Sequence, residues 1–600
     1  MIRKLSSHHH LLVKKYYLPL TTLTRTYHST GSLHSSSSSL PKVSSWHKTS
    51  TTTVKCPFDH QNSSMTTMIH NDQVPEDSFS EMNTSSNPPH HQSLKSFDDL
   101  PGPKPLPFIG NLLEFSKHKG IPNQYLYELC EQYGEMVKIK LPFHNALLIS
   151  NPEIIEQVVK KDDRRESPQA LRYFKQRNNI ELLPLEMNYY EDWQSIRNLY
   201  NIAMKPENLE KVSLPQITQL NSDFLKLVIS KLQKVEQQNG PFKNTYKLAN
   251  AFDITSVYTF RAVTKVFLGV NVNSELVEKQ LPWSIDEFVD ASVRGTDIAI
   301  ALGMKPPFYK LFKTREYREM EFLLNKSFQG CKIFVKMFDK NPNPDMPRLK
   351  ELIDERASGM PNPEQKTAGV LSAFITGGVD ITSRIMVNEI YRLAHHKEYQ
   401  EKLYEELRQV FGEPSVDEFT SEFGLQVTAD KYKKLKLTRH FLEETLRMNS
   451  FSYLTNGRWL LNDIELNGYL IPKNTRVIIM TYHPSMNEKY VPRAKEFIPE
   501  RHEKGHPLAP KSMYCNLPFG IGARKCPGSR IASTELHFAL INLVRHFKLT
   551  HEHDEKFPET SHDQSMLYID SKKYPLYLTP RDHLKPIVEK HFEESSNNRL

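Results

Sequence analysis

The stretch that decides the fold lies near the C-terminal end of the sequence and reads Phe519-Gly520-Ile521-Gly522-Ala523-Arg524-Lys525-Cys526-Pro527-Gly528. Three of the 22 glycines of the chain fall within it, and glycine permits the positive φ values that a tight loop around a bulky planar group requires. A lone cysteine, Cys526, stands just before a helix predicted over 528–547. Because backbone N–H groups and the helix dipole favour a thiolate there, we expect the Cys526 sulfur to bind an iron on one axial face.

This stretch matches the pattern F-x-x-G-x-R-x-C-x-G at its five fixed positions, which are Phe519, Gly522, Arg524, Cys526 and Gly528. It resembles the signature of the cytochrome P450 family, in which the cysteine thiolate is the proximal ligand of the heme iron. The resemblance implies heme b as cofactor, Cys526 as the metal ligand and the P450 fold, mainly α with small β elements. The alternative, a buried cysteine in a glycine turn, leaves the other fixed positions unexplained.

Two elements that precede this stretch occur in the order that the family has. Glu444 and Arg447 form E-x-x-R, which puts both side chains on one helix face, and residues 497–501 resemble the family element F-x-P-E-R. The resemblance joins Arg501 to the first pair in a Glu–Arg–Arg network. Buried charges need several partners, so we assign these three residues to structure and heme-loop support.

Other basic residues are candidates for holding the heme propionates. Trp193 and Arg197 form W-x-x-x-R, and one helical turn brings them to the same side. The resemblance gives this face to a propionate, and it gives Arg524 to the same anion from the cysteine loop, because a guanidinium fork suits a carboxylate. Arg458 is a third candidate. Without the other motifs, a solvated amphipathic helix would explain Trp193 and Arg197 equally well.

A helix predicted over 367–396 carries Gly377 and Gly378 side by side. Each glycine inside a helix lowers helix stability by about 1 kcal/mol relative to alanine, so the absence of side chains here must serve a purpose. Room for dioxygen above an iron is a sufficient reason. The family pattern is A/G-G-x-D/E-T, with an acid and an alcohol that handle water and protons. Gly377, Gly378 and Asp380 match this pattern, but Ile381 stands at the alcohol position.

Ile381 cannot donate a hydrogen bond, and the next hydroxyl, Thr382, is rotated by about 100° around the helix. A local helix distortion, a substrate hydroxyl or ordered water would have to substitute. We therefore name Asp380, Thr382, Gly377 and Gly378 as catalytic candidates, with Asp380 as the proton relay. The alternative for Asp380 is an ordinary ion pair with Arg384.

Two further motifs are not interpreted as sites. Residues 502–506 spell the zinc-peptidase signature H-E-x-x-H, but Gly505 and the neighbouring prolines predict a loop, in which His502 and His506 share no helical face. Gly520-Ile521-Gly522 begins a G-x-G-x-x-G string that ends in Lys525, so a dinucleotide loop is not supported.

The net charge of +8 is located in the N-terminal leader. Residues 1–58 hold eight basic and no acidic side chains, and the other 70 basic residues equal the 70 acidic ones, so a nucleic-acid surface is not supported. An acid-free leader with arginine, lysine and many Ser and Thr residues predicts a mitochondrial transit peptide over 1–58, with a disordered polar tail as the alternative. Five cysteines without a C-x-x-C pair indicate a reducing compartment.

The remaining sequence predicts one large domain. Residues 59–96 are rich in Ser, Asn and His and predict a disordered linker, residues 97–590 form the heme-thiolate domain, and 591–600 are a tail. Helix spacing appears over 213–236, 248–268, 315–340, 367–396 and 397–411, and strand-like runs over 136–140, 146–150, 457–465 and 475–481.

A transit-like leader without a visible membrane anchor points, through the resemblance, to the mitochondrial class of the family. Its members receive electrons from a ferredoxin that an NADPH-dependent reductase reduces, so we expect a matrix location, soluble or peripheral to the inner membrane. A basic cluster precedes Glu444 and would suit an acidic partner; it consists of Lys431, Lys433, Lys434, Lys436 and Arg439. However, Glu443 stands where that class often has lysine, and a solvated charged face is nearly as good an explanation.

Three functions remain open at this stage. The first is a monooxygenase that hydroxylates a lipophilic small molecule, with a steroid or sterol as the expected class. The second is a heme-thiolate isomerase or lyase that acts on a peroxide without external electrons, because some family members of that kind also lack the threonine that Ile381 replaces. The third is a non-catalytic heme protein.

Overall fold

The structure is a computed structural model of the 600-residue chain. It describes residues 94–117, 122–142, 144–161, 169–180, 190–235, 244–272, 280–303, 307–422, 424–450, 454–552, 556–563 and 566–597. These residues lie in one of the two units into which the chain divides, His90–Leu600. The predicted transit peptide and residues 59–93 of the predicted linker lie outside the described residues.

Helices make up most of the described chain, and the prediction of a mainly α fold with small β elements is confirmed. The longer helices are α2 (Pro122–Tyr133), α3 (Pro152–Lys160), α4 (Gln169–Asn178), α5 (Tyr190–Met204), α8 (Asn221–Ser230), α9 (Ala251–Leu268), α11 (Ile285–Gly303), α12 (Arg315–Met337), α13 (Leu349–Ala357), α14 (Pro363–Gly378), α15 (Asp380–His395), α16 (Lys397–Phe411), α19 (Lys436–Met448), α21 (Ser529–His546) and α22 (Lys585–Asn597). The shorter ones are α1 (Leu112–Lys117), α6 (Pro206–Asn208), α7 (Leu214–Thr218), α17 (Asp417–Thr420), α18 (Ala429–Lys434) and α20 (Tyr482–Ser485).

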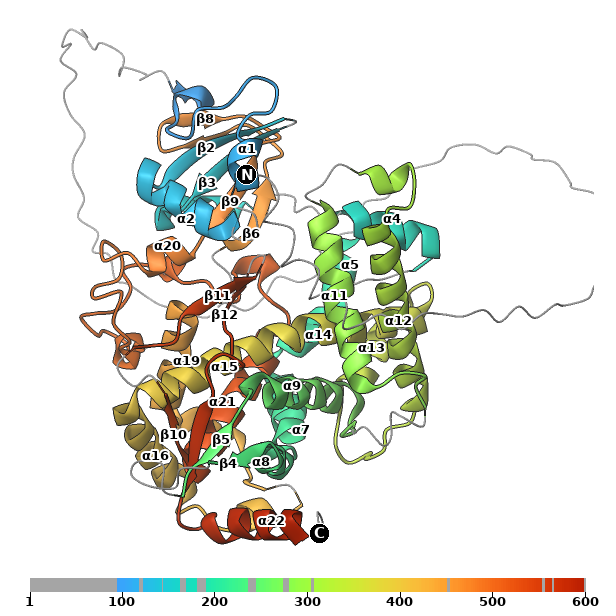
Figure 1. Ribbon diagram of the computed structural model, residues 1–600. Coiled ribbons are helices and arrows are strands. Elements are labelled where there is room, and N and C mark those ends of the chain that lie inside the picture. Colours follow the sequence, from blue (N-terminus) through green and yellow to red (C-terminus); the bar gives the residue numbers. More distant parts are fainter. Residues whose placement is uncertain are drawn as a thin grey trace, which may run out of the picture. The chain divides into compact units, whose positions relative to one another are not determined.

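The helix predicted over 367–396 is present as α14 and α15, which follow one another in nearly the same direction (Figure 1). Pro363 starts α14 at a position where a missing N–H costs nothing. Val379 separates the two helices, although its N–H still donates to the Ile375 carbonyl (3.1 Å) and its own carbonyl accepts from Ser383 N (3.0 Å). The Thr259 hydroxyl of α9 also donates to the Val379 carbonyl (3.3 Å), and a side chain that binds a helix carbonyl is a recognised cause of a local distortion.

Helices α11 and α12 lie side by side (Figure 1) because glycines remove side chains where the two meet. A Cβ at Gly330 of α12 would lie 2.4 Å from the ring of Phe288 on α11, and a Cβ at Gly295 would lie 2.9 Å from Leu324. Neither glycine has a positive φ. Close helix approach, not backbone conformation, therefore requires glycine here.

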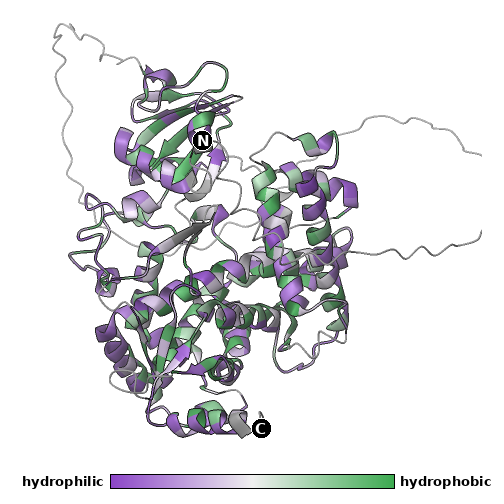
Figure 2. Ribbon diagram, viewed as in Figure 1, coloured by the Kyte–Doolittle hydropathy of each residue, from purple (hydrophilic) through white to green (hydrophobic). Residues whose placement is uncertain are grey.

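Four small sheets accompany the helices. The largest mixed sheet has the strand order β2-β3-β9-β6, formed by β2 (Met136–Leu141), β3 (His144–Ile149), β9 (Arg476–Met480) and β6 (Leu454–Trp459). β2 and β3 are antiparallel, β3 and β9 parallel, and β9 and β6 antiparallel. Hydrophobic residues run along these strands (Figure 2), where residues such as Ile139 and Leu148 are fully buried. The sequence predicted β2, β3, β9 and the second half of β6.

The register of β6 shifts between Thr455 and Arg458. A Cβ at Gly457 would lie 2.5 Å from the Val477 carbonyl oxygen, so only glycine fits this bulge. The bulge sets the position of Arg458, one of the predicted propionate ligands.

The other sheets have three, four and two strands. Their orders are β1-β8-β7, β10-β13-β5-β4 and β11-β12, formed by β1 (Lys95–Ser96), β7 (Ile464–Leu466), β8 (Tyr469–Ile471), β4 (Leu232–Lys234), β5 (Tyr246–Leu248), β10 (Phe547–His551), β13 (Leu576–Pro580), β11 (Thr560–Asp563) and β12 (Met566–Ile569).

The structure differs from the predicted boundaries in three places. The helix predicted over 213–236 is divided into α7, α8 and β4, because Asn221 uses its side chain to donate to the Leu425 carbonyl (2.6 Å) and the chain turns just before it. Strand β1 lies within the last two residues of the predicted linker. Helix α22 extends into the predicted tail, where Phe592 stacks on Tyr246 with ring centroids 4.9 Å apart.

Among the described residues, Pro363–His395 is long and apolar enough to cross a membrane by length and composition. However, 67% of its apolar window is buried inside the structure, where α14 and α15 contact α9, α12 and α21. This segment is therefore a core element.

Replacing Gly330 with alanine tests the close packing of α11 on α12. We expect Gly330→Ala to lower the free energy of unfolding by about 1–3 kcal/mol, because the new methyl group overlaps the Phe288 ring. Gly359→Ala is the matched control, since a Cβ there meets nothing within 4 Å, and its effect should stay within about 0.5 kcal/mol. Thermal and denaturant unfolding of the purified holoprotein would measure both, and equal stability of the two variants would contradict this account.

Candidate functional site

The predicted glycine loop before α21 is a tight turn. Gly520 and Gly522 each have φ +67°, the left-handed conformation that the glycine pattern predicted, and residues Gly522–Arg524 form a single 3-10 turn, η8. The Cys526 N–H donates to the Phe519 carbonyl (2.8 Å), which closes the loop on itself. Phe519, Gly522 and Gly528 thus shape the loop that carries Cys526.

The Cys526 sulfur lies where the sequence predicted, immediately before α21. Burial raises the pKa of its thiol, whereas hydrogen bonds from the backbone N–H groups of Gly528 and Ser529 and the charges of Arg197 and Lys525 lower it. The predicted N–H donors are therefore present, but burial outweighs them. A coordinated metal ion deprotonates a thiol outright, so this environment suits a sulfur that is charged only when it binds iron.

Arg197 of α5 binds the same loop directly. Its Nη2 donates to the carbonyl of Lys525 at 2.5 Å, so the residue before the cysteine is held by a helix more than 300 positions earlier in the sequence. Burial lowers the pKa of Arg197, the Cys526 thiolate opposes this, and Arg524 adds to it. Arg197, Arg524 and Cys526 therefore share one electrostatic environment. The side chain of Trp193 lies outside the described residues.

Three predicted propionate ligands are deeply buried although each carries a guanidinium group. Arg197 and Arg524 are 5% exposed and Arg458 is 3% exposed, and they come from α5, the cysteine loop and β6. Burying a cation is costly unless an anion compensates it. A heme, with two propionates, is the kind of anion that suits this set of residues.

Helix α14 passes close to the cysteine loop. A Cβ built on Gly528 would lie 4.0 Å from both Cys526 Sγ and Phe374 Cε1, so Phe374 of α14 is a neighbour of the loop. Three residues further along, Gly377 is exposed, and a Cβ there would meet nothing within 4 Å. Open space beside α14, together with a buried sulfur and buried cations, fits a bound heme.

The two adjacent glycines serve different purposes. A Cβ on Gly378 would lie 3.0 Å from Val263 of α9, so Gly378 permits close helix packing, whereas Gly377 faces open space. The sequence predicted open space for both glycines, and the structure places it at Gly377.

The acid of the predicted oxygen-binding segment has a partner. Asp380 is buried and its Oδ1 accepts a hydrogen bond from Arg384 Nε at 2.9 Å, which is the ion pair considered as the alternative reading. The guanidinium of Arg384 in turn lies over the rings of Tyr568 and Phe252. Thr382 is 3% exposed, whereas Ile381 is only partly buried. The local helix distortion considered for this segment occurs at Val379.

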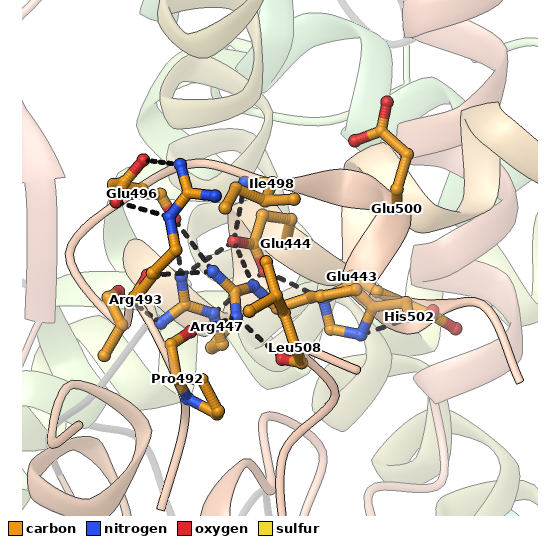
Figure 3. Close-up of polar contacts among 12 residues, drawn as sticks. Glu443, Glu444, Arg447, Pro492, Arg493, Glu496, Ile498, Glu500, His502 and Leu508 are labelled. Carbon is orange, nitrogen blue, oxygen red and sulfur yellow. Dashed lines mark hydrogen bonds and ion pairs between the residues drawn. The ribbon is translucent and has the colours of Figure 1, made fainter. Parts of the chain in front are cut away.

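The Glu–Arg–Arg network expected from the motifs is present and fully buried (Figure 3). Arg447 donates to both oxygens of Glu444 (2.8 and 2.7 Å), and Arg501 Nε donates to Glu444 Oε1 (2.9 Å). The Ile498 N–H adds a further bond to Oε1 (2.9 Å). The carboxylate of Glu444 thus holds α19 against the segment over 498–501.

His502 is a member of this network that sequence reasoning missed. Its Nε2 lies 2.9 Å from Glu444 Oε2, and its Nδ1 lies 3.8 Å from Glu443. The sequence held only a weak indication of this role: His502 directly follows Arg501, which was assigned to the network. Within the described residues, no cluster of three or more histidine, cysteine and acidic side chains could hold a metal ion.

The two arginines use their remaining N–H groups on backbone carbonyls. Arg447 binds those of Ser485, Ala494 and Glu496, and Arg501 binds those of Pro492, Arg493, Glu496 and Leu508. These carbonyls belong to the long loop that leads to the cysteine loop. Burial raises the pKa of Glu444, but the bonds from Arg447 and His502 and the charge of Arg501 outweigh it and hold the pKa at about 2.

The predicted basic cluster is partly engaged with the protein itself. Lys433 pairs with Glu210 at 2.6 Å, and Lys431 lies over the Phe411 ring. Lys434, Lys436 and Arg439 are exposed. These three residues therefore form the accessible part of the cluster.

The sequence matches known proteins over most of its length. The family model for "Cytochrome P450" matches residues 100–578. "Probable cytochrome P450 49a1" of Drosophila melanogaster is 26% identical over 501 residues, which cover 77% of this chain and 80% of that protein. "Cytochrome P450 27C1" of Danio rerio is 24% identical over 491 residues (78% and 83%). "Probable cytochrome P450 12b2, mitochondrial" of Drosophila melanogaster is 24% identical over 491 residues (76% and 85%).

Replacing Glu444 with glutamine tests the buried network. We expect Glu444→Gln to lower the free energy of unfolding by about 3–5 kcal/mol, because two buried guanidinium groups lose their counter-charge. The stabilisation by Glu444 exists above its ordinary pKa of 4.5 and disappears as the pH falls through that value toward about 2. Denaturant unfolding between these pH values would measure both effects.

Glu443→Gln is the matched control for this variant, since the Glu443 side chain is 44% exposed and lies 3.8 Å from His502. It should leave the stability and its acid dependence unchanged. An acid dependence that persists undiminished in Glu444→Gln would contradict the assignment.

Proposed function

Since the chain belongs to the cytochrome P450 family, a family of heme-thiolate monooxygenases, we propose that it hydroxylates a lipophilic small molecule in the mitochondrion with electrons from a ferredoxin. The balanced reaction converts R–H, O2, two electrons and two protons into R–OH and water. The observation that carries the proposal is the closed loop that presents Cys526 Sγ beside α14, with buried Arg197 bound to the carbonyl of Lys525.

Heme, when bound, would supply the reductive activation of dioxygen, which amino-acid side chains cannot provide. Cys526 would hold its iron through the thiolate. Arg197, Arg524 and Arg458 would bind the propionates, because their guanidinium groups are buried and suit carboxylates. Phe519, Gly522 and Gly528 would keep the loop tight enough to present the sulfur.

The residues of α14 and α15 would receive the substrates. Gly377 leaves space beside the helix, and Ala373 and Ile381, both partly buried, flank it with apolar surface. An apolar wall favours a lipophilic substrate such as a steroid or sterol. Asp380, held by Arg384, would order water and relay protons.

Several observations support a ferredoxin partner and a mitochondrial location. Some relatives carry "mitochondrial" in their names, and the first 58 residues have the composition of a transit peptide. The ferredoxin, reduced by an NADPH-dependent reductase, would dock on the accessible basic residues Lys434, Lys436 and Arg439, whose charge complements an acidic surface.

Ile381 favours one second function, a heme-thiolate isomerase or lyase that rearranges a peroxide without external electrons. The two functions differ in their need for reductant. A monooxygenase consumes NADPH and ferredoxin in proportion to the product formed, whereas an isomerase forms product from a peroxide alone. Product formation that is independent of NADPH would replace the first proposal by the second.

Replacing Cys526 with alanine tests the iron ligand. The reduced wild-type protein with carbon monoxide should give the absorbance typical of a thiolate ligand, and we expect Cys526→Ala to lose this absorbance because no sulfur remains at the iron. Cys515→Ala is the control, since Cys515 is buried in a cluster with Val491 and Ala494, and it should retain the wild-type spectrum. A thiolate spectrum in Cys526→Ala would disprove the assignment.

Reversing the accessible basic charges tests the ferredoxin surface. We expect the triple variant Lys434→Glu, Lys436→Glu and Arg439→Glu to lower the rate of ferredoxin-dependent reduction about tenfold at low salt, with a smaller difference at high salt, because exposed charges are screened. Lys433 stays unchanged because Glu210 already pairs with it. Stopped-flow reduction of the holoprotein would measure the rate.

The control carries the same charge change on other elements, as Lys556→Glu, Lys573→Glu and Lys590→Glu. These lysines are exposed, and this variant should be reduced at the wild-type rate. Equal rates for both triple variants would remove the docking assignment.

A further inference from the structure

The proposed monooxygenase function leaves one requirement open in the oxygen-binding segment. Ile381 carries no hydrogen-bond donor, and Asp380 already accepts a bond from Arg384. Another hydroxyl close to the open space beside Gly377 would therefore be needed. The inference below rests on the proposed function and concerns where that hydroxyl lies.

Thr376 has a hydroxyl that the fold itself does not use. Its Oγ1 is buried and has no hydrogen-bond partner among the residues that the structure describes. Two other hydroxyls on the same two helices have partners: Thr367 donates to Asp354 (2.5 Å), and Ser383 donates to the Asp380 carbonyl (2.9 Å). A buried polar group without a partner costs stability, so the hydroxyl of Thr376 needs an explanation.

The position of Thr376 supplies an explanation. It directly precedes Gly377, whose missing side chain leaves open space, and it stands one helical turn before Asp380, on the same side of the helix. Two residues before it, Phe374 reaches the neighbourhood of Cys526 and Gly528. Thr376 thus directly adjoins the residue that leaves open space and lies one helical turn before the acid.

The side chain can bring its hydroxyl into this space without moving the backbone. Threonine in a helix divides between two χ1 rotamers, and exchange between them swaps the hydroxyl with the methyl group. Thr376 as a whole is only partly buried although its Oγ1 is enclosed, so other atoms of the residue reach accessible space. Because the enclosed rotamer leaves the hydroxyl without a partner, a partner in the open space would draw the hydroxyl out.

We propose that Thr376 donates the hydrogen bond to dioxygen that Ile381 cannot donate. Helix α14 thereby supplies the donor one turn before Asp380, instead of one residue after it. Thr382 suits this role less, because it is 3% exposed and lies on the buried side of α15.

The test compares three holoprotein variants. Thr376→Val removes the hydroxyl and keeps the shape, Thr376→Ser keeps the hydroxyl, and Thr264→Val is the matched control. Thr264 is a fully buried threonine of α9 whose hydroxyl donates to the Phe260 carbonyl (2.8 Å). Three measurements apply to each variant: the C–O stretching frequency of the carbon monoxide complex, the fraction of NADPH that ends as hydrogen peroxide, and the thermal midpoint.

Carbon monoxide occupies the position of dioxygen, and its stretching frequency responds to a nearby hydrogen-bond donor. We expect Thr376→Val to shift this frequency and to raise the peroxide fraction at least threefold, with substrate Kd within twofold of the wild type. Thr376→Ser should behave as the wild type. Thr264→Val should keep the wild-type frequency and peroxide fraction, although its thermal midpoint should fall because it loses the bond to the Phe260 carbonyl. The thermal midpoint of Thr376→Val should not fall, because no hydrogen bond within the protein is lost.

Adding Ile381→Thr to Thr376→Val should restore the peroxide fraction toward the wild-type value, because it returns an alcohol to the usual position. An unchanged frequency and peroxide fraction in Thr376→Val would overturn the proposal. So would a change in substrate Kd alone, which would assign the hydroxyl to a polar group of the substrate. The carbon monoxide measurement needs neither ferredoxin nor substrate, so it tests Thr376 even if the proposed electron donor is wrong.

Discussion

The carboxylate of Glu444 is the interaction on which the rest of the structure depends. It is fully buried and accepts hydrogen bonds from Arg447, Arg501, His502 and the Ile498 backbone. Each arginine then fixes carbonyls of the loop over 485–508, which precedes the cysteine loop in sequence. A carboxylate in apolar surroundings is tolerated only with so many partners. The position of Cys526 therefore depends on an anion that takes no part in chemistry.

The second constraint is the balance of charge around Cys526. Arg197, Arg524 and Arg458 bring positive charge into the interior from three separate parts of the chain, and one of them is tied to the carbonyl of Lys525. Burial raises the pKa of the Cys526 thiol, whereas a coordinated metal ion favours the thiolate. The sulfur of Cys526, the three buried guanidinium groups and the open space at Gly377 thus all suit the same cofactor, a planar heme with two propionates.

The sequence predicted those parts of the fold and the site whose conformation is determined by residues close together in the chain. Helix α16 coincides with the predicted 397–411, and the positive φ values of Gly520 and Gly522 follow from the glycine spacing. Contacts between distant segments were not predictable. The bond from Asn221 to Leu425 divides a predicted helix, the bond from Thr259 to Val379 distorts another, and His502 joins Glu444 across 58 positions. Each depends on a side chain meeting a partner that only the folded chain supplies.

The bonds of Arg447 and Arg501 to main-chain carbonyls have an evolutionary consequence. Seven of these contacts engage backbone oxygens over residues 485–508, and every amino acid offers the same carbonyl. Mutations in this loop can therefore accumulate without disturbing the scaffold, provided that the two arginines and the glutamate persist. An identity of about one residue in four to its relatives is compatible with a shared scaffold for this reason.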